Sequence, residues 1–156
     1  MKTFLCSAFF AMIGFNVMAQ TNSLAPTKLT FAVFDWEKLK PVAVTNGVRR
    51  AVFDAPTATL DKLHCHITTL NPGEASGEAR LHLQEEVIIV KEGMIEATSD
   101  GKVETVGAGS VIFFNSHAVT RLRNPGKAPA TYTVVYYFTP LTPKKLKARS
   151  LERKFC

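Results

Sequence analysis

The chain has 156 residues, of which 46% are hydrophobic, and a formal net charge of +6 at pH 7. This length fits one domain of ordinary size with a single hydrophobic core. The positive charge is concentrated at the C-terminus, because residues 20–143 carry twelve basic and twelve acidic side chains while residues 144–156 are strongly basic. A balanced charge over the main part of the chain argues against a basic binding face, so we expect no nucleic-acid partner.

The first nineteen residues have the pattern of a secretory signal peptide. Lys2 precedes an apolar run over residues 4–15, and small residues follow up to Ala19. The alternative is an N-terminal membrane anchor, but the run is shorter than the roughly 20 apolar residues of a spanning helix. We therefore expect a signal peptide at residues 1–19, a periplasmic or secreted mature protein, and no transmembrane segment after cleavage.

The middle of the chain alternates short β-rich segments with turns that contain Gly, Pro and Asn. We expect strands within residues 30–36, 47–54, 60–70, 86–93, 94–101, 102–106, 110–115, 119–124 and 130–139. A loop should lie at residues 71–78, and Asp100-Gly101 should form a tight hairpin turn. Because no helix is predicted before the C-terminal tail, the sequence indicates one antiparallel all-β domain over residues 20–143.

Apolar side chains at strand positions are candidates for the core or for a face that pairs with a second copy of the chain. They are Val87, Ile89, Ile112, Phe114, Val134 and Tyr136. Gly93, Gly101 and Gly126 are assigned to turns.

The C-terminal end leaves two questions open. Cys65 and Cys156 remain after export, and an oxidising compartment permits a disulfide between them, with a free or intermolecular thiol as the alternative. The basic tail at residues 144–156 is best explained as a solvated segment, and a short helix or contact with an anionic membrane surface is the alternative.

Two segments resemble the two sequence motifs of the cupins. "NPGEASGEARLHLQEEVIIVKEG" (71–93) is similar to the first motif, and "GAGSVIFFNSHAVTRLRNPG" (107–126) is similar to the second. With flanking segments such as "TYTVVYYF", the likeness covers roughly residues 30–139, as in small exported single-domain cupins of the type 2 kind. The resemblance implies an antiparallel jelly-roll (cupin) β-barrel with a ligand or metal site at its mouth, and cupins often form homodimers.

The resemblance also implies a metal site, which this sequence matches only in part. Cupins typically hold Mn, Fe, Ni or Zn with three His and one Glu. Here His82 and Glu86 are retained, while Arg80 and Thr120 stand at two of the His positions. A guanidinium cannot act as a ligand, and about 5 Å from a divalent ion it would repel that ion by roughly 6 kcal/mol at an effective dielectric of 20. The metal site therefore looks degenerate.

Two classes of function follow, and the sequence leaves both open. One is a pocket for a small polar or anionic molecule, bound by Arg80, His82, Glu86 and Thr120. Its simpler counterpart is an ion pair of Arg80 with Glu86 or Glu85 that has no ligand role. The other class is a metal-dependent enzyme of the dioxygenase, isomerase or decarboxylase type.

In the enzyme class, the metal would be held by His82 and Glu86 together with a replacement ligand. The candidates for that ligand are His64, His66 and His117. The alternative for His64 and His66 is a solvated or hydrogen-bonded pair on one face of a strand, and for His117 it is an ordinary loop position. No catalytic residue is assigned by the sequence.

Overall fold

The structure, a computed structural model, describes residues 27–142 and consists almost entirely of antiparallel strands. The strands are β1 (Val42–Val44), β2 (Gly47–Ala55), β3 (Lys62–Leu70), β4 (Arg80–Leu81), β5 (Glu85–Glu92), β6 (Met94–Ser99), β7 (Lys102–Gly107), β8 (Val111–Phe114), β9 (Val119–Arg123) and β10 (Ala130–Phe138). One short 3-10 helix, η1 (Trp36–Lys38), precedes them. The prediction of an antiparallel all-β fold is confirmed.

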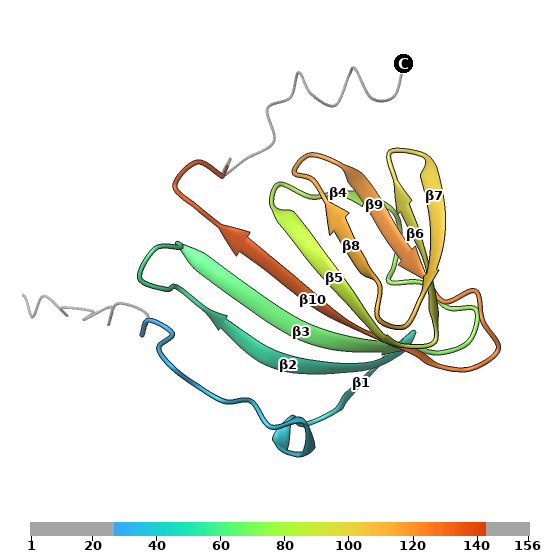
Figure 1. The fold of residues 1–156 in the computed structure, drawn as a ribbon, viewed down its shortest axis with the longest axis horizontal. Coiled ribbons are helices and arrows are strands. Elements are labelled where there is room, and N and C mark those ends of the chain that lie inside the picture. Colours follow the sequence, from blue (N-terminus) through green and yellow to red (C-terminus); the bar gives the residue numbers. More distant parts are fainter. Residues whose placement is uncertain (1–26, 143–156) are drawn as a thin grey trace, which may run out of the picture.

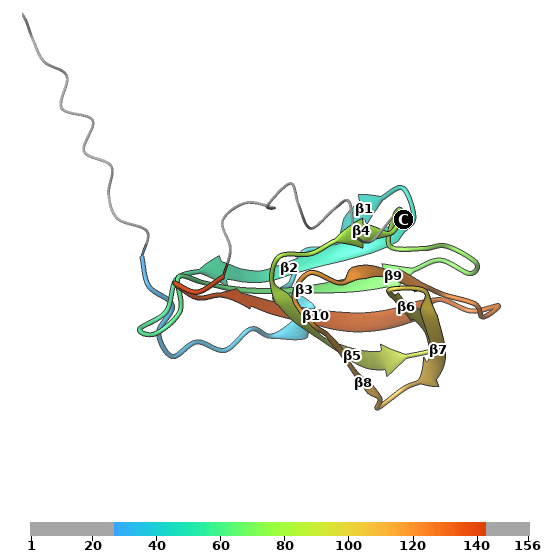
Figure 2. The same cartoon turned by 90° about the horizontal axis from the view of Figure 1, so that it is seen from above.

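The strands form two sheets. The larger has the order β1-β2-β3-β10-β5-β8, and the smaller has the order β4-β9-β6-β7. The long strands β2, β3, β10 and β5 run side by side, and the four-stranded sheet lies toward one end of them (Figure 1). The view from above shows the same arrangement from a second side (Figure 2). This order brings strands that are distant in the sequence, such as β3 and β10, into direct contact.

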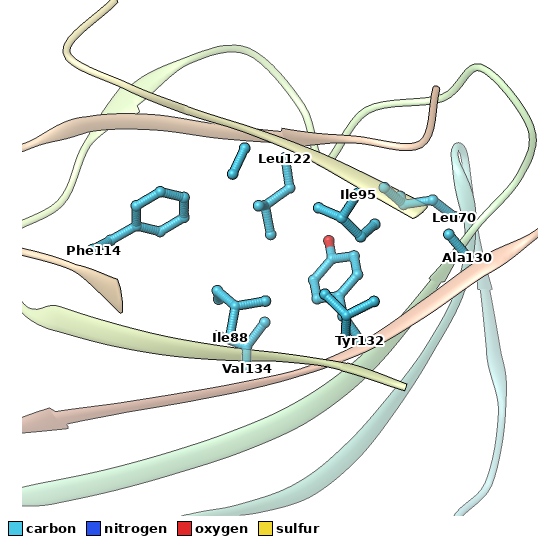
Figure 3. Packing of buried hydrophobic residues seen from close by; sticks show 10 residues of the cluster. Leu70, Ile88, Ile95, Phe114, Leu122, Ala130, Tyr132 and Val134 are labelled. Atoms are coloured by element: carbon cyan, nitrogen blue, oxygen red, sulfur yellow. The ribbon is translucent and has the colours of Figure 1, made fainter. Parts of the chain in front are cut away.

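The hydrophobic core joins the two sheets. Ile88 and Val134 come from the six-stranded sheet, and Ile95 and Leu122 come from the four-stranded sheet (Figure 3). Ile88 and Ile95 are completely buried. Burying one such side chain contributes roughly 1.5–3 kcal/mol, so contact between these side chains holds the sheets together.

The positions predicted for the core or for a dimer face divide between buried and exposed residues. Phe114 and Val134 are buried as expected. On β5 the buried residues are Ile88 and Val90, while Ile89 is 43% exposed on the opposite face. The segment "EVIIV" is apolar on both faces, so its alternation could not show which face would be covered.

The strand predicted at residues 30–36 is wrong. This segment is extended and then enters η1, where the Asp35 side chain accepts a hydrogen bond from the Glu37 backbone N–H at 3.1 Å. Two of its aromatic residues, Phe34 and Trp36, contact side chains of the large sheet instead of adding a strand. The Trp36 ring lies 4.5 Å from the Arg50 guanidinium carbon and 3.6 Å from Lys91 Nζ. Trp36 is therefore held by cation–π contacts and not by pairing of its segment in a sheet.

One further prediction about the chain is confirmed, two strands were not predicted, and several predictions are not tested. The turn Asp100-Gly101 has φ angles of 46° and 84° and joins β6 to β7 as expected. The short strands β1 and β4 were not predicted as separate elements. Residues 1–26 and 143–156 lie outside the described part, so the signal peptide, the domain limits, the basic tail and Cys156 remain predictions.

Two further observations hold within residues 27–142. Cys65 is buried and forms no disulfide there. No helix in that range is long and apolar enough to cross a membrane.

Candidate ligand site: a cavity between the sheets

A cavity of about 600 Å³ opens between the two sheets, and all four predicted ligand-binding residues line it. This volume is in the usual range of small-molecule sites, about 300–1,000 Å³. The polar side chains in the lining come from both sheets and from loops that connect their strands: Asn46, Arg49, His66, Thr68, Ser76, Glu78, Arg80, His82, Gln84, Glu86, Thr120, Arg121, Tyr132 and Tyr136. Sequence segments far apart therefore meet at one site.

Backbone pairing explains why the two motifs meet. Arg80 on β4 is the cross-strand partner of Thr120 on β9. His82 follows β4 and its backbone N–H donates to the Ala118 carbonyl at 3.2 Å. Glu86 lies on β5 opposite Phe114 of β8, on the buried face of that strand. Thus the first and second motifs face each other across strand pairs.

Arg80, His82 and Glu86 form a continuous hydrogen-bonded row. Arg80 Nε donates to His82 Nε2 at 3.1 Å, so that ring nitrogen is the acceptor. His82 Nδ1 therefore carries the proton and donates to Glu86 Oε1 at 2.8 Å. The Gln84 amide also donates to Glu86 Oε1, at 2.9 Å. Both nitrogens of His82 are thus engaged within the protein.

Glu86 is a buried carboxylate that the surrounding donors keep ionised. It is only 7% exposed. Burial alone would raise the pKa of Glu86, but the hydrogen bonds from His82 and Gln84, aided by the Arg80 charge, lower that pKa below its ordinary value. Its negative charge is therefore balanced by groups already present in the cavity.

The predicted ion pairs of Arg80 are not formed. Within residues 27–142, no ion pair joins Arg80 to Glu86 or to Glu85. His82 stands between Arg80 and Glu86, and Glu85 accepts a hydrogen bond from the Tyr137 hydroxyl instead. Adjacent residues on a strand point to opposite faces, so Glu85 is directed away from the face that carries Glu86.

The residues present do not fit a divalent metal ion in this arrangement. Among residues 27–142, no three His, Cys, Asp or Glu side chains are placed together to hold one. His66 lines the cavity, whereas neither His64 nor His117 belongs to its lining. The His82 Nε2 lone pair, which would have to bind the metal, accepts a hydrogen from Arg80. A metal would require Arg80 and His82 to separate and a further ligand to move.

Arg49 is a site residue that motif reasoning missed. It lies on β2 opposite Thr68 of β3, outside both cupin-like segments. The only sequence signal was the alternation in "GVRRAVFD", which does not show that β2 borders the site. Its positive charge lowers the pKa of His66 and contributes to the environment of Tyr132. The cavity is therefore more cationic than the motifs alone indicate.

His66 is neutral at pH 7 because its surroundings oppose a charge. Burial, followed by the charges of Arg49 and the neighbouring His64, lowers the pKa of His66 from 6.5 to about 4. His64 Nε2 lies 2.9 Å from His66 Nδ1, so the hydrogen-bonded pair considered from the sequence is present. His66 therefore enters the cavity as an uncharged imidazole.

We expect the low pKa of His66 to make the fold less stable in acid. The unfolded chain binds a proton at His66 below about pH 6.5, whereas the folded chain does so only near pH 4, so stability falls as pH drops through this window. The loss should be on the order of 2 kcal/mol after a discount for partial exposure. Urea unfolding at pH 7 and pH 4.5 should show a smaller pH dependence for His66→Gln than for the wild type. An equal dependence in both proteins would contradict this prediction.

Comparisons with known proteins agree with this architecture. Residues 66–136 match the family model described as Cupin domain. An RmlC-like cupin from Shewanella frigidimarina NCIMB 400 has 16% identity and a TM-score of 0.60 over 74% of this chain and 97% of that chain. A predicted oxalate decarboxylase from Thermotoga maritima has 17% identity and a TM-score of 0.57, covering 69% of this chain and 99% of that one.

A third similar structure is the polyketide cyclase RemF from Streptomyces resistomycificus. It has 19% identity and a TM-score of 0.58, covering 76% of this chain and 89% of that chain. No curated protein matches the chain. At these identities the structural likeness shows the fold alone, and the prediction of a jelly-roll fold is confirmed.

Proposed function

Since the chain is a member of the cupin superfamily, we propose that its cavity binds a small anionic or polar molecule at a degenerate metal site. The proposed binding residues are Arg80, His82, Glu86 and Thr120. The observation that carries this proposal is the bond from Arg80 Nε to His82 Nε2. It directs a permanent positive charge to the ring nitrogen that a metal ion would need.

The charges of the lining support an anionic ligand. Three guanidinium groups, those of Arg49, Arg80 and Arg121, line the cavity together with two carboxylates, those of Glu78 and Glu86. The Glu86 carboxylate already accepts hydrogen bonds from His82 and Gln84. A planar guanidinium can bind a carboxylate or phosphate through two parallel hydrogen bonds. An incoming anion would thus find cationic groups that the protein itself does not fully neutralise.

Neutral hydroxyl groups add donors for the same ligand. Thr120 is 4% exposed and Tyr132 is 2% exposed, and both line the cavity. Burial raises the pKa of Tyr132 to about 12, so its hydroxyl keeps its proton at neutral pH. Polar groups that converge on one cavity can offer several hydrogen bonds to a small molecule.

The first experiment measures binding of two probe anions, oxalate and inorganic phosphate, by isothermal titration calorimetry. We expect Arg80→Gln to weaken binding about tenfold or more, because a hydrogen bond to a charged group contributes about 1.5–3 kcal/mol. Arg123→Gln is the matched control, since Arg123 lies on β9 outside the cavity lining. Equal affinities in the two variants, or no binding of either probe at millimolar concentration, would argue against an anion site.

We also propose that the protein is exported. The support is the sequence pattern of residues 1–19 alone. Intact mass analysis of protein purified after expression with the complete N-terminus should give a chain that begins at Gln20. A mass that includes Met1 would contradict export by a cleaved signal peptide.

The outer face of the large sheet supports the proposal of a homodimer. Ile89 on β5 pairs with Val111 on the edge strand β8, and Phe113 follows on the same face. Ile89, Val111 and Phe113 are 43%, 66% and 58% exposed. Contiguous exposed apolar side chains beside a sheet edge are a common feature of protein–protein contacts.

A further inference from the structure

Three polar side chains, those of His66, His64 and Asp54, lie in a row from the cavity to strand β2. His64 Nε2 and His66 Nδ1 are 2.9 Å apart on β3. On its other side, His64 Nδ1 lies 3.4 Å from Asp54 Oδ2 on β2. The His64 ring is also held by stacking on Tyr136, with ring centroids 4.3 Å apart and an interplanar angle of 10°. Asp54, His64 and His66 therefore form an ordered row, which we call the histidine row.

The carboxylate at one end of the histidine row determines the positions of the protons. Asp54 is paired with Lys62 Nζ at 2.9 Å, and the pKa of Asp54 is lowered because this pairing and His64 together outweigh its partial burial. His64 Nδ1 is buried and forms no hydrogen bond within residues 27–142, but the negatively charged Asp54 carboxylate lies 3.4 Å from it and favours a proton on this nitrogen electrostatically. The favoured tautomer of His64 therefore carries its proton on Nδ1, directed at Asp54.

The same reasoning extends to His66. With the proton of His64 on Nδ1, His64 Nε2 is an acceptor, so His66 Nδ1 must carry the donated proton. His66 Nε2 is then the nitrogen with a free lone pair. Since His66 lines the cavity and its Nδ1 is bonded to His64, Nε2 is the ring nitrogen that remains for a ligand. The histidine row thus presents an oriented base to the cavity.

We propose that the cavity is a metal-free acid–base centre in which His66 removes a proton from a bound 2-oxo carboxylate. This inference rests on the proposed function, because the guanidinium groups must first bind the carboxylate. A 2-oxo carboxylate such as pyruvate offers both an anion for Arg80 or Arg49 and an acidic C–H next to a carbonyl. His66 is the catalytic residue, and His64 and Asp54 are positioning residues.

The step balances without an oxidant, a reductant or a metal. His66 Nε2 takes the proton from the carbon next to the carbonyl, and the C–H electron pair forms the new C=C bond. The carbonyl π pair moves to oxygen and gives an enolate, whose charge a lining guanidinium or the Tyr132 hydroxyl stabilises. Return of a proton from His66 to the carbon completes the cycle. In D2O the returned hydrogen is deuterium when His66 has exchanged its proton with solvent.

Because charged groups surround His66, the pKa of its imidazole depends on whether the anion is bound. The groups that influence it are Arg49, His64, Glu86 and Arg80, and the arginines lower its pKa. A bound carboxylate offsets these positive charges and favours protonation of the imidazole. His66 therefore becomes a stronger base when the anion is present.

The first measurement needs no ligand. The ¹⁵N NMR shifts of the His66 ring should show a protonated Nδ1 and an unprotonated Nε2 in the wild-type protein at pH 7.5. In Asp54→Asn, whose amide no longer favours one His64 tautomer, both nitrogens should move toward averaged shifts. A wild-type protein with the proton of His66 on Nε2 overturns the proposal, whatever the cavity binds.

The second measurement uses pyruvate as the probe. Its methyl signal is followed by ¹H NMR in D2O, and pyruvate binding is measured in parallel by calorimetry. We expect His66→Gln to retain pyruvate binding and to slow the protein-dependent exchange about 100-fold or more, as for loss of a general base. Asp54→Asn should slow exchange less and shift its pH profile, an effect that a merely structural role would not produce.

The outcomes separate this inference from the proposed function. If the wild-type protein binds pyruvate but exchanges its methyl hydrogens no faster than His66→Gln does, the acid–base centre is overturned and the anion site remains supported. Absence of pyruvate binding overturns both, because the base would then have no bound substrate. Binding with exchange that depends on His66 and Asp54 supports both.

Discussion

Replacing Asn124 with Asp is expected to destabilise the fold by about 3–5 kcal/mol, because it buries a charge among carbonyl groups. Asn124 is completely buried. Its Nδ2 donates to the carbonyls of Leu70, Asn71 and Ala128 at 3.2, 3.2 and 2.8 Å, and its Oδ1 accepts from the Gly126 N–H at 2.9 Å. Aspartate has the same shape but cannot donate these bonds when it is ionised.

Urea unfolding at pH 7 measures this effect. Asn115→Asp is the matched control, since Asn115 lies at an exposed position and donates only to the adjacent Ser116 carbonyl. We expect the control to change the free energy of unfolding by less than about 0.5 kcal/mol. If both variants lose the same stability, the hydrogen bonds of Asn124 do not hold the loops together as inferred.

The geometry also assigns a structural role to Asn124, which lies in the second cupin-like segment, residues 107–126. Asn124 ties the end of β3 and the loop after it to the turn before β10. It does not belong to the cavity lining. One residue of this segment can therefore stabilise the fold, while another residue of the same segment, Thr120, lines the cavity.

Replacing Arg80 with His is expected to raise the affinity for Ni²⁺ or Zn²⁺ by about ten-thousandfold or more. The substitution removes a repulsion of roughly 6 kcal/mol, taken at 5 Å and a dielectric of 20, and adds an imidazole ligand beside His82 and Glu86. It also frees His82 Nε2, which in the wild-type protein accepts a hydrogen bond from Arg80 Nε. Because Arg80 and Thr120 are cross-strand partners, adding Thr120→His should increase the affinity further.

Elemental analysis after desalting and competition titration with a chelator measure this gain. Arg80→Gln is the control, because it removes the positive charge without supplying a ligand. If Arg80→His retains no more metal than Arg80→Gln, then the strands do not bring these positions to coordinating distance. A wild-type protein that already holds metal stoichiometrically would instead show that Arg80 moves away in solution, as the metalloenzyme alternative requires.

Sequence reasoning placed most strands correctly because their patterns are local. The segments at residues 47–54, 60–70 and 130–139 correspond to β2, β3 and β10 within one or two residues. Segment 30–36 was predicted as a strand in error, because its residue Trp36 contacts Arg50 and Lys91, which are distant in the sequence, and does not pair in a sheet. Local composition indicates that such residues are buried or packed, but it does not distinguish pairing in a sheet from packing on its face.

The spacing of the motifs placed part of the candidate site. Arg80, His82, Glu86 and Thr120 line one cavity, and whether they bind a ligand stays a prediction. The motifs could not show that Arg80 bonds to His82 instead of Glu86. That choice depends on the position of His82 just beyond β4, where its backbone pairs with Ala118.

The sequence by itself determined the all-β class, the order of the strands along the chain and the presence of Arg80 and Thr120 at two positions where the cupin resemblance implies histidine, because each depends on residue types at short spacing. Only the tertiary structure decided which face of β5 is buried, brought Arg49 to the cavity and aligned Asp54 with His64 and His66. These features depend on which strands become neighbours. Strand pairing joins residues that are far apart in the sequence, and the packing of the two sheets together selects it.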